Sequence, residues 1–195
     1  KQITNKQKSS NNWGVALYRL ATLKTGMEAE DLYKQAIKKF QQTIKTDPNE
    51  PRALTNWGNS LVRLAETRTG MEAEDLYKQA IEKYQRAGKE NSSDYNTLEA
   101  EGYALLMLAK NKEEKEAKKI YQEAYAKLEE VYKHTNQCYN LACCSTHLKR
   151  TEDALKYLKI SIENNENTVE AILRDDDWKS YRGNNEFKTI TRKEN

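Results

Sequence analysis

The chain has 195 residues, of which 33 are basic and 30 acidic, for a formal net charge of +3. Both signs are interspersed along the sequence, so the concentrated basic face of a nucleic-acid-binding protein is not expected. The 2 prolines and 7 glycines, beside abundant Ala, Leu, Lys, Glu and Gln, favour an all-helical structure. The longest uncharged apolar run, near residues 102–109, is far shorter than the ~20 residues that cross a bilayer.

Cysteine usage and the chain ends bear on the compartment. The three cysteines, Cys138, Cys143 and Cys144, are an odd set that does not suit a disulfide framework. They indicate a reducing compartment, so we expect a cytoplasmic protein, with an organelle surface or interior left open. No secretory leader is recognised. Because the first residue is Lys1 rather than Met, a fragment, a processed form and the ordered part of a longer chain all stay open.

A long internal repeat organises the sequence. Residues 25–37 recur letter for letter as residues 69–81, 44 residues later, and Trp13-Gly14 returns as Trp57-Gly58. A degenerate third copy keeps small, apolar and aromatic residues at the same spacing. Such a period is typical of stacked repeat units. The sequence therefore predicts a polar lead-in (1–10), four repeats (11–54, 55–98, 99–138 and 139–168) and a C-terminal cap and tail (169–195).

In chain order, the polar residues 1–10 are a frayed lead-in or the beginning of the first helix. Apolar residues at three- and four-residue spacing predict amphipathic helices from Asn11 to about Leu23 and from about Glu28 to Thr46. The second ends before Pro48, and Pro51 suits the start of the next. Each repeat is thus expected to be an antiparallel helix pair, which gives eight helices in four pairs.

One glycine recurs inside the first helix of three repeats, as Gly14, Gly58 and Gly102. A glycine in mid-helix costs roughly 1 kcal/mol relative to alanine. Its recurrence predicts a close approach of the partner helix at this position.

The spacing of small and aromatic residues resembles a known family. In the first unit it is Gly14 … Ala36-x3-Phe40-x2-Thr43-x4-Pro48, which resembles the second half of the tetratricopeptide repeat (TPR) consensus. The usual unit has about 34 residues, so we interpret the longer repeat as a longer helix pair with an altered turn. The opening Trp-Gly-x-x-Leu with Gly-Met-Glu-Ala-Glu-x-Leu-Tyr is similar to an extended variant in bacterial repeat proteins and, more distantly, to the plant mitochondrial import receptor. The resemblance implies an all-α solenoid of antiparallel pairs wound into a right-handed superhelix.

The last segment is similar to the closing segment of bacterial arrays of this kind. Its aromatic residues, Trp178, Tyr181 and Phe187, are expected to cover the apolar face of the last helix pair. The adjacent acids Asp175, Asp176 and Asp177 are interpreted as helix initiation and solvation rather than as a metal or acid cluster.

The TPR resemblance implies that the first helix of each pair lines a concave groove. Alignment on Gly14, Gly58, Gly102 and Ala142 then places four residues of each unit there, including Val15, Thr55, Val62, Glu99, Leu106, Cys143 and Thr146. The residues predicted to bind a partner are Asn11, Tyr18, Arg19, Asn59, Arg63, Tyr103, Met107, Tyr139 and His147. The recurring Tyr33, Tyr77 and Tyr121 are predicted to be core residues instead.

This predicted surface grades from cationic and amide-bearing to aromatic, so a peptide with an acidic end and a hydrophobic end would complement it. The carboxylate clamp by which some TPR proteins hold chaperone tails needs Lys, Asn and Arg at positions where this sequence has Asn11, Val15, Tyr103 and Met107. A chaperone-tail adaptor is therefore disfavoured.

Residues with catalytic or metal-binding potential are few. His134, Cys138, Cys143 and His147 have a spacing that suits zinc ligands, and His147 is a potential base for a cysteine nucleophile. Cysteine is also a common small apolar core residue, and packed thiols are the favoured interpretation.

We therefore expect a non-catalytic scaffold or adaptor that binds a peptide or helix of a protein partner in the concave groove, with no metal or cofactor. It is compatible with a subunit of a larger complex. The alternative is the regulatory repeat region of a larger enzyme, of protease or nucleotidase type, whose catalytic part lies outside this chain. Partner identity does not follow from the sequence.

Overall fold

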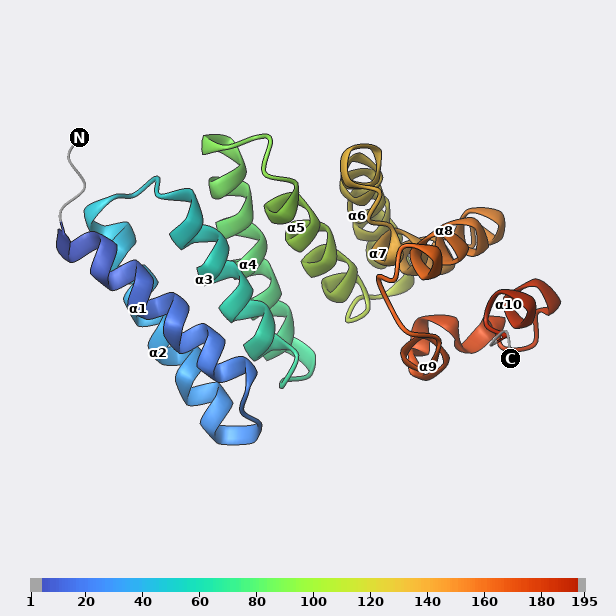
Figure 1. Cartoon of the computed structure of the whole chain (residues 1–195), viewed down its shortest axis with the longest axis horizontal. Coiled ribbons are helices and arrows are strands. Elements are labelled where there is room, and N and C mark those ends of the chain that lie inside the picture. Colours follow the sequence, from blue (N-terminus) through green and yellow to red (C-terminus); the bar gives the residue numbers. More distant parts are fainter. Residues whose placement is uncertain (1–4, 193–195) are drawn as a thin grey trace.

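The computed structural model describes the backbone of residues 5–192 and side chains from Ser9 onward. Eight α-helices follow one another as antiparallel pairs, and three short helices close the chain (Figure 1). The pairs are α1 (Asn5–Thr22) with α2 (Gly26–Thr46), α3 (Pro51–Ala65) with α4 (Gly70–Glu90), α5 (Tyr95–Ala109) with α6 (Glu114–Thr135), and α7 (Tyr139–His147) with α8 (Thr151–Glu163). The closing segment contains α9 (Val169–Arg174), the 3-10 helix η1 (Asp176–Tyr181) and α10 (Asn185–Ile190). Residues 5–192 contain no β-strand, so the predicted all-α solenoid of four pairs is confirmed.

The first helix begins earlier than the periodicity indicates. It starts at Asn5 rather than Asn11, so the described part of the polar lead-in is helical. Ser10 supports this extension because its hydroxyl donates to the carbonyl of Lys39 at 3.2 Å on the paired helix. Residues 1–4 lie outside the described residues. No helix in the described part of the chain is long and apolar enough to cross a membrane.

The turns between helices follow from local chemistry. Gly26 and Gly70 begin α2 and α4 with a φ of +60°, a left-handed conformation that glycine adopts without a steric cost. Pro51 is the first residue of α3, and the side chain of Glu50 accepts a hydrogen bond from the backbone amide of Ala53. The predicted helix end before Pro48 and start at Pro51 are confirmed.

Recurring glycines let the two helices of a pair pack closely. A Cβ atom on Gly58 would lie 2.5 Å from Cε1 of Tyr84, and one on Gly14 would lie 2.6 Å from Cε1 of Phe40. At Gly102 the corresponding neighbour is Leu128, at 2.7 Å. The predicted close approach is confirmed, because each glycine faces a large side chain of its paired helix.

The core runs between the helices of each pair and between successive pairs. Tyr33, Tyr77 and Tyr121 are all buried, as predicted. Each second helix contacts the first helix of the next pair, and the first helices also contact one another: α1 with α3, α3 with α5 and α5 with α7. This arrangement places the first helices on the inner side of the array.

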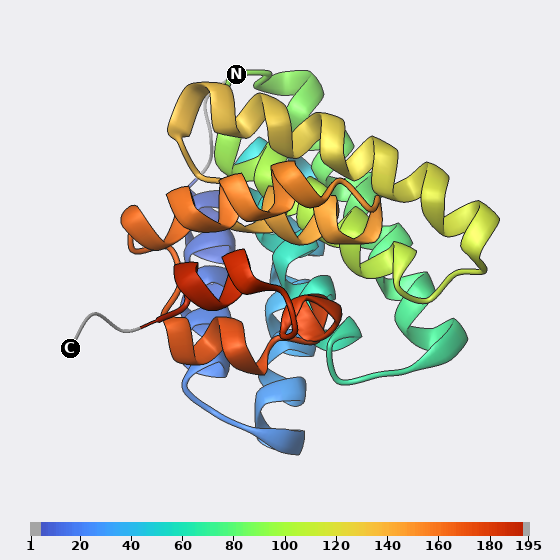
Figure 2. The same cartoon turned by 90° about the vertical axis from the view of Figure 1, so that its right-hand side faces the viewer.

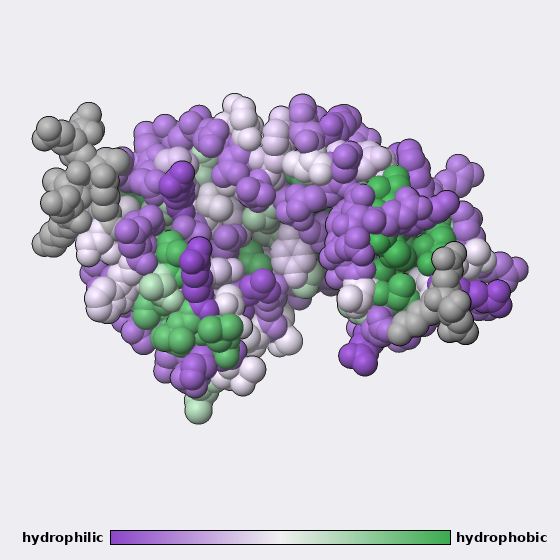
Figure 3. All heavy atoms as spheres, viewed as in Figure 1, coloured by the Kyte–Doolittle hydropathy of each residue, from purple (hydrophilic) through white to green (hydrophobic). Residues whose placement is uncertain are grey.

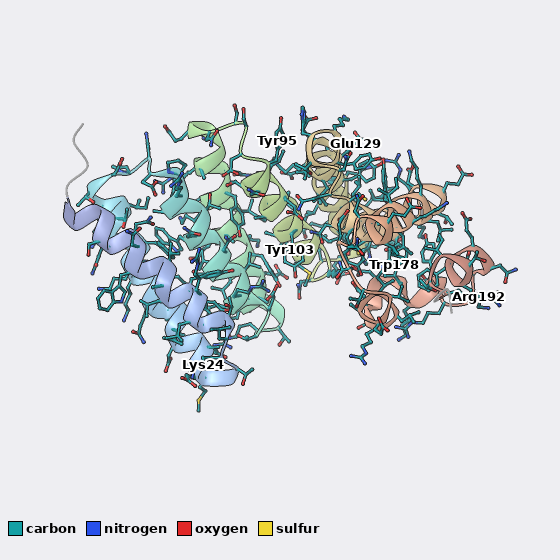
Figure 4. The ribbon with its side chains drawn as sticks, viewed as in Figure 1. Lys24, Tyr95, Tyr103, Glu129, Trp178 and Arg192 are labelled. Carbon is teal, nitrogen blue, oxygen red and sulfur yellow. The ribbon has the colours of Figure 1, made fainter. Side chains whose placement is uncertain are left out.

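The closing segment caps the last pair. Trp178, Tyr181 and Phe187 are buried in the same cluster as Leu158 of α8, and the Trp178 and Phe187 rings stack with centroids 5.6 Å apart. Figure 2 shows the closing helices beside α7 and α8, and Figure 4 labels Trp178. The predicted cap is therefore present and covers apolar surface that the last pair would otherwise expose.

Candidate binding groove

Three side chains on the inner surface connect the second and third pairs. Arg63 Nη1 on α3 lies 3.0 Å from Oε2 of Glu66, the residue directly after that helix, and the hydroxyl of Tyr103 on α5 donates to Glu66 Oε1 at 2.9 Å. Desolvation lowers the pKa of Arg63, but Glu66 and the Tyr18 hydroxyl outweigh it and raise that pKa above its ordinary value. Arg63 is therefore a fixed cation whose charge is already neutralised by Glu66. Tyr103 is labelled near the middle of the array in Figure 4.

A hollow lies next to this contact, between the first and second pairs. It has a volume of about 440 Å³ and is lined by Tyr33, Arg63 and Glu66 together with residues of the turn after α1. Glu30, which also lines the hollow, forms an ion pair across the two pairs, with its Oε2 2.5 Å from Arg68 Nη2. The hydrogen bond from Arg68 lowers the pKa of Glu30 to about 2.

The exposure of the predicted partner-binding residues differs along the array. Arg19 and Arg63 are exposed, whereas Tyr18, Tyr103 and Met107 are half-buried. Asn59 accepts a hydrogen bond from the Tyr84 hydroxyl at 2.8 Å, so its side chain also supports the pairing of α3 with α4. Asn11 is half-buried, and its Oδ1 has no hydrogen-bond partner among the described residues.

Three positions assigned to the groove by alignment are core residues. Val62 and Leu106 are buried because they follow the packed glycines Gly58 and Gly102 by four residues. Residues four apart lie on the same face of a helix, so these side chains point at the paired helix rather than into the groove. Cys143 is also buried, beneath the closing segment.

At the fourth pair the closing segment occupies the groove positions. The Tyr139 hydroxyl donates to Asp175 Oδ2 at 2.7 Å, and His147 Nε2 lies 2.8 Å from Asp177 Oδ1. Lys110 Nζ, from the third pair, lies 2.7 Å from the same Asp177 oxygen. Tyr139 and His147 therefore contact the cap, and their assignment as partner-binding residues stays a prediction.

The predicted solvation of the three acids is wrong for Asp177. This residue is buried, and although burial raises its pKa, His147 and Lys110 lower the pKa below its ordinary value. Asp175 does initiate the 3-10 helix, since its carboxylate accepts from the amide of Asp177 at 3.0 Å.

Two groove residues, Glu66 and Lys110, were missed from the sequence. Each is the residue directly after the end of its helix, three positions beyond Arg63 and Met107 respectively. Extending the same helical stripe by one more turn would have found them. The inner strip (Arg19, Arg63, Glu66, Tyr103, Met107 and Lys110) therefore carries both signs of charge.

The four residues considered as zinc ligands are not brought together. The His134 ring stacks on Tyr95, whereas Cys138 Sγ lies 3.3 Å from the carbonyl oxygen of Tyr157. Burial raises the pKa of the Cys143 thiol well above its ordinary value, which opposes a thiolate nucleophile. The cysteines are packed thiols, as the favoured interpretation had it.

Cys143, Asp175 and Asp177 form the one group of potential metal ligands found among the described residues. Both carboxylates already accept protein donors there, Asp175 from Tyr139 and Asp177 from Lys110. This cluster joins the cap to the array.

The fold belongs to the class of TPR-like helical-repeat solenoids, and solved structures of that class are similar to it. A structure described as "MamA 41-end from Desulfovibrio magneticus RS-1" superimposes with a TM-score of 0.67 at 15% identity, covering 97% of this chain and 95% of that one. The "MamA RS-1 ArsTM double mutant" gives a TM-score of 0.66 at 13% identity, with 97% and 96% covered. YrrB, described as "a TPR protein with an unusual peptide-binding site", gives 0.58 at 12% identity, with 96% and 89% covered.

A family model described as "Plant specific mitochondrial import receptor subunit TOM20" matches residues 4–98, slightly less than half of the chain. A search of curated protein sequences gave no match. The family match covers the first two helix pairs, which carry the hollow beside Arg63 and Glu66.

Proposed function

We propose that the chain is a non-catalytic scaffold that holds a peptide or helix of a partner protein along its inner strip. The observation that carries the proposal is the alignment of Arg63, Glu66 and Tyr103 across two pairs, beside a hollow of about 440 Å³. One solenoid unit offers only a short surface, whereas aligned units offer a continuous strip. The similar fold of YrrB, a TPR protein with a peptide-binding site, supports this use of the solenoid.

The family match favours one kind of partner over others. A mitochondrial import receptor binds proteins destined for the organelle, and their targeting segments are amphipathic, Arg-rich and poor in acidic residues. Glu66 supplies an anion for the basic face of such a segment, while Tyr18, Tyr103 and Met107 supply apolar surface. A location on the cytoplasmic side of an organelle membrane agrees with both the free thiols and this match.

A peptide with an acidic end is the other candidate, which the cationic residues Arg19 and Arg63 favour. Because Glu66 and Arg63 are paired with each other, a peptide of either charge would have to compete with that contact. A regulatory repeat region of a larger enzyme would use the same strip. The full-length reading frame that encodes this chain would distinguish that role from a separate scaffold.

The two peptide chemistries predict opposite effects of one substitution. Fluorescence anisotropy measures the binding of two labelled amphipathic helices. One is Arg-rich and the other has an acidic end. Arg63→Glu should strengthen binding of the basic peptide, and Glu66→Lys should weaken it by about tenfold or more. Lys78→Glu, on the exposed face of α4, is the charge-matched control and should change neither. Binding of the acidic peptide alone would reject the receptor proposal, and binding of neither would count against the groove.

A further inference from the structure

The three long helix pairs differ at one equivalent position, which in the second and third pairs faces the preceding pair. In the first two, a tryptophan lies near a lysine of the paired helix: Lys39 Nζ is 5.5 Å from the Trp13 ring centroid, and Lys83 Nζ is 4.8 Å from that of Trp57. In the third pair the residue 44 positions after Trp57 is Glu101, and the residue 44 after Lys83 is Lys127. Glu101 Oε1 and Lys127 Nζ lie 3.0 Å apart.

The third pair lacks this tryptophan, and a second large side chain is also missing at the junction between the second and third pairs. Between the first and second pairs, Trp57 and Ile44 both pack against the buried cluster that contains Phe40. Between the second and third pairs, the residues at these three positions are Glu101, Gly88 and Tyr84. A hollow of about 400 Å³ opens there, lined in part by Tyr84, Gly88, Leu98, Glu101 and Lys127. Its residues include the turn from α4 to α5, which lies at the upper edge of Figure 1.

The carboxylate on the wall of this hollow is buried and has one ionic partner. Glu101 is only 4% exposed, and its Oε1 is buried. Lys127 Nζ, 3.0 Å from Oε1, neutralises its charge, and no other donor among the described residues reaches that oxygen. Buried carboxylates are stabilised by donors, and the terminal torsion of glutamate is broad enough to turn either oxygen toward the hollow.

We propose that this hollow binds a planar aromatic ring that carries an N–H group, of the indole class. The ring would take the place that Trp57 fills at the preceding junction and lie near Lys127 as Trp57 lies near Lys83. Its N–H would donate to Glu101, and Tyr84 and Leu98 supply apolar walls. The volume lies within the range of about 300–1,000 Å³ that is typical of small-molecule sites. The shared chemistry is an indole, from a free small molecule or from a tryptophan side chain of a bound peptide.

This site is distinct from the inner strip and goes beyond the proposed function. Glu101 lies two residues from Glu99 and two from Tyr103, and residues two apart project from different faces of a helix. A partner held on the inner strip and an indole held in this hollow would therefore use separate surfaces.

The test is an NMR titration of the isotopically labelled full chain with indole, 1-methylindole and the pentapeptide Gly-Gly-Trp-Gly-Gly. We expect saturable shifts of the Gly88 and Lys127 amides with indole or with the pentapeptide, and binding of 1-methylindole about tenfold weaker because it has no N–H. Saturation by indole indicates a small-molecule site, and saturation by the pentapeptide alone indicates a peptide side chain. Both outcomes support the proposal.

Two variants block the hollow with residues that the chain itself uses at the preceding junction. Gly88→Ile adds the side chain found at Ile44, and a Cβ on Gly88 meets nothing within 4 Å, so folding should be retained. Glu101→Trp adds the counterpart of Trp57. Each should abolish the shifts, whereas Met71→Ile, at an exposed site, should leave them unchanged. Absence of saturable shifts with all probes, or equal binding by Gly88→Ile, would overturn the proposal.

Discussion

At the scale of single residues, Gly58 sets the distance between α3 and α4. The Tyr84 ring against it is held by its hydroxyl contact with Asn59, so the ring has little freedom to move aside. Gly58→Ala should lower the free energy of unfolding by about 1–3 kcal/mol through overpacking. Gly88→Ala is the matched control, because its Cβ enters open space and should raise stability by roughly 0.5–1 kcal/mol. Urea unfolding measures the free energy of unfolding of both variants. Equal values for Gly58→Ala and Gly88→Ala would contradict the close packing at Gly58.

The ion pair of Glu30 with Arg68 predicts a pH dependence. The pKa of Glu30 is about 2 in the folded chain against an ordinary value of 4.5, so the folded state binds this proton less readily than the unfolded state. The contribution is fully present above pH 4.5 and is lost as the pH falls toward 2. The stability difference between the natural chain and Arg68→Gln should therefore shrink over that range. Arg52→Gln, at an exposed position, is the control. Its stability difference from the natural chain should not change with pH over that range.

At the scale of elements, the closing segment is joined to the array through Asp177. Asp177→Ala leaves Lys110 and His147 without their shared carboxylate and should destabilise the chain by about 1–3 kcal/mol. Asp176→Ala, at the exposed neighbouring acid, is the control and should change stability by less than about 0.5 kcal/mol. Hydrogen exchange should rise in α7 and the closing helices and stay unchanged in α1 and α2. A uniform rise would show that the cap is not a local unit.

The elements were the part of the structure that the sequence could predict. Helix periodicity, Pro51 and the repeated glycines act locally, so their effects can be predicted from the sequence. The role of Asp177 was not predictable in this way, because its partners Lys110 and His147 are far from it in the chain. The same reason explains why the contacts of Tyr139 and His147 with the cap were not predicted: only the folded chain brings Asp175 and Asp177 to these positions.

At the scale of the whole molecule, the two ends of the array differ. The closing segment covers α7 and α8, whereas α1 leaves Trp13 60% exposed and Leu20 44% exposed. Apolar surface is visible at the lower left of Figure 3, over the first pair, and a second apolar area is visible at the right-hand end. Leu64, the counterpart of Leu20 in the second pair, is only 6% exposed because the first pair covers it.

This asymmetry predicts where unfolding begins. In a solenoid each pair is stabilised by its neighbours, and α1 packs against fewer of them than α3 does. Amides of α1 should exchange with solvent faster than the equivalent amides of α3 in a hydrogen-exchange experiment under native conditions. Slower exchange in α1 than in α3 would contradict a stability that is shared between neighbouring pairs.

The central claim is that the inner strip holds a protein partner. A photo-crosslinking amino acid is placed at Arg19 or Arg63 on the first helices, and at Lys78 or Lys118 on exposed faces of the second helices. After irradiation in cells, the adducts are identified by mass spectrometry. We expect the same partner to be captured from positions 19 and 63 and not from positions 78 and 118. Capture of one partner from positions 78 and 118, with none from 19 or 63, would contradict the assignment of the groove.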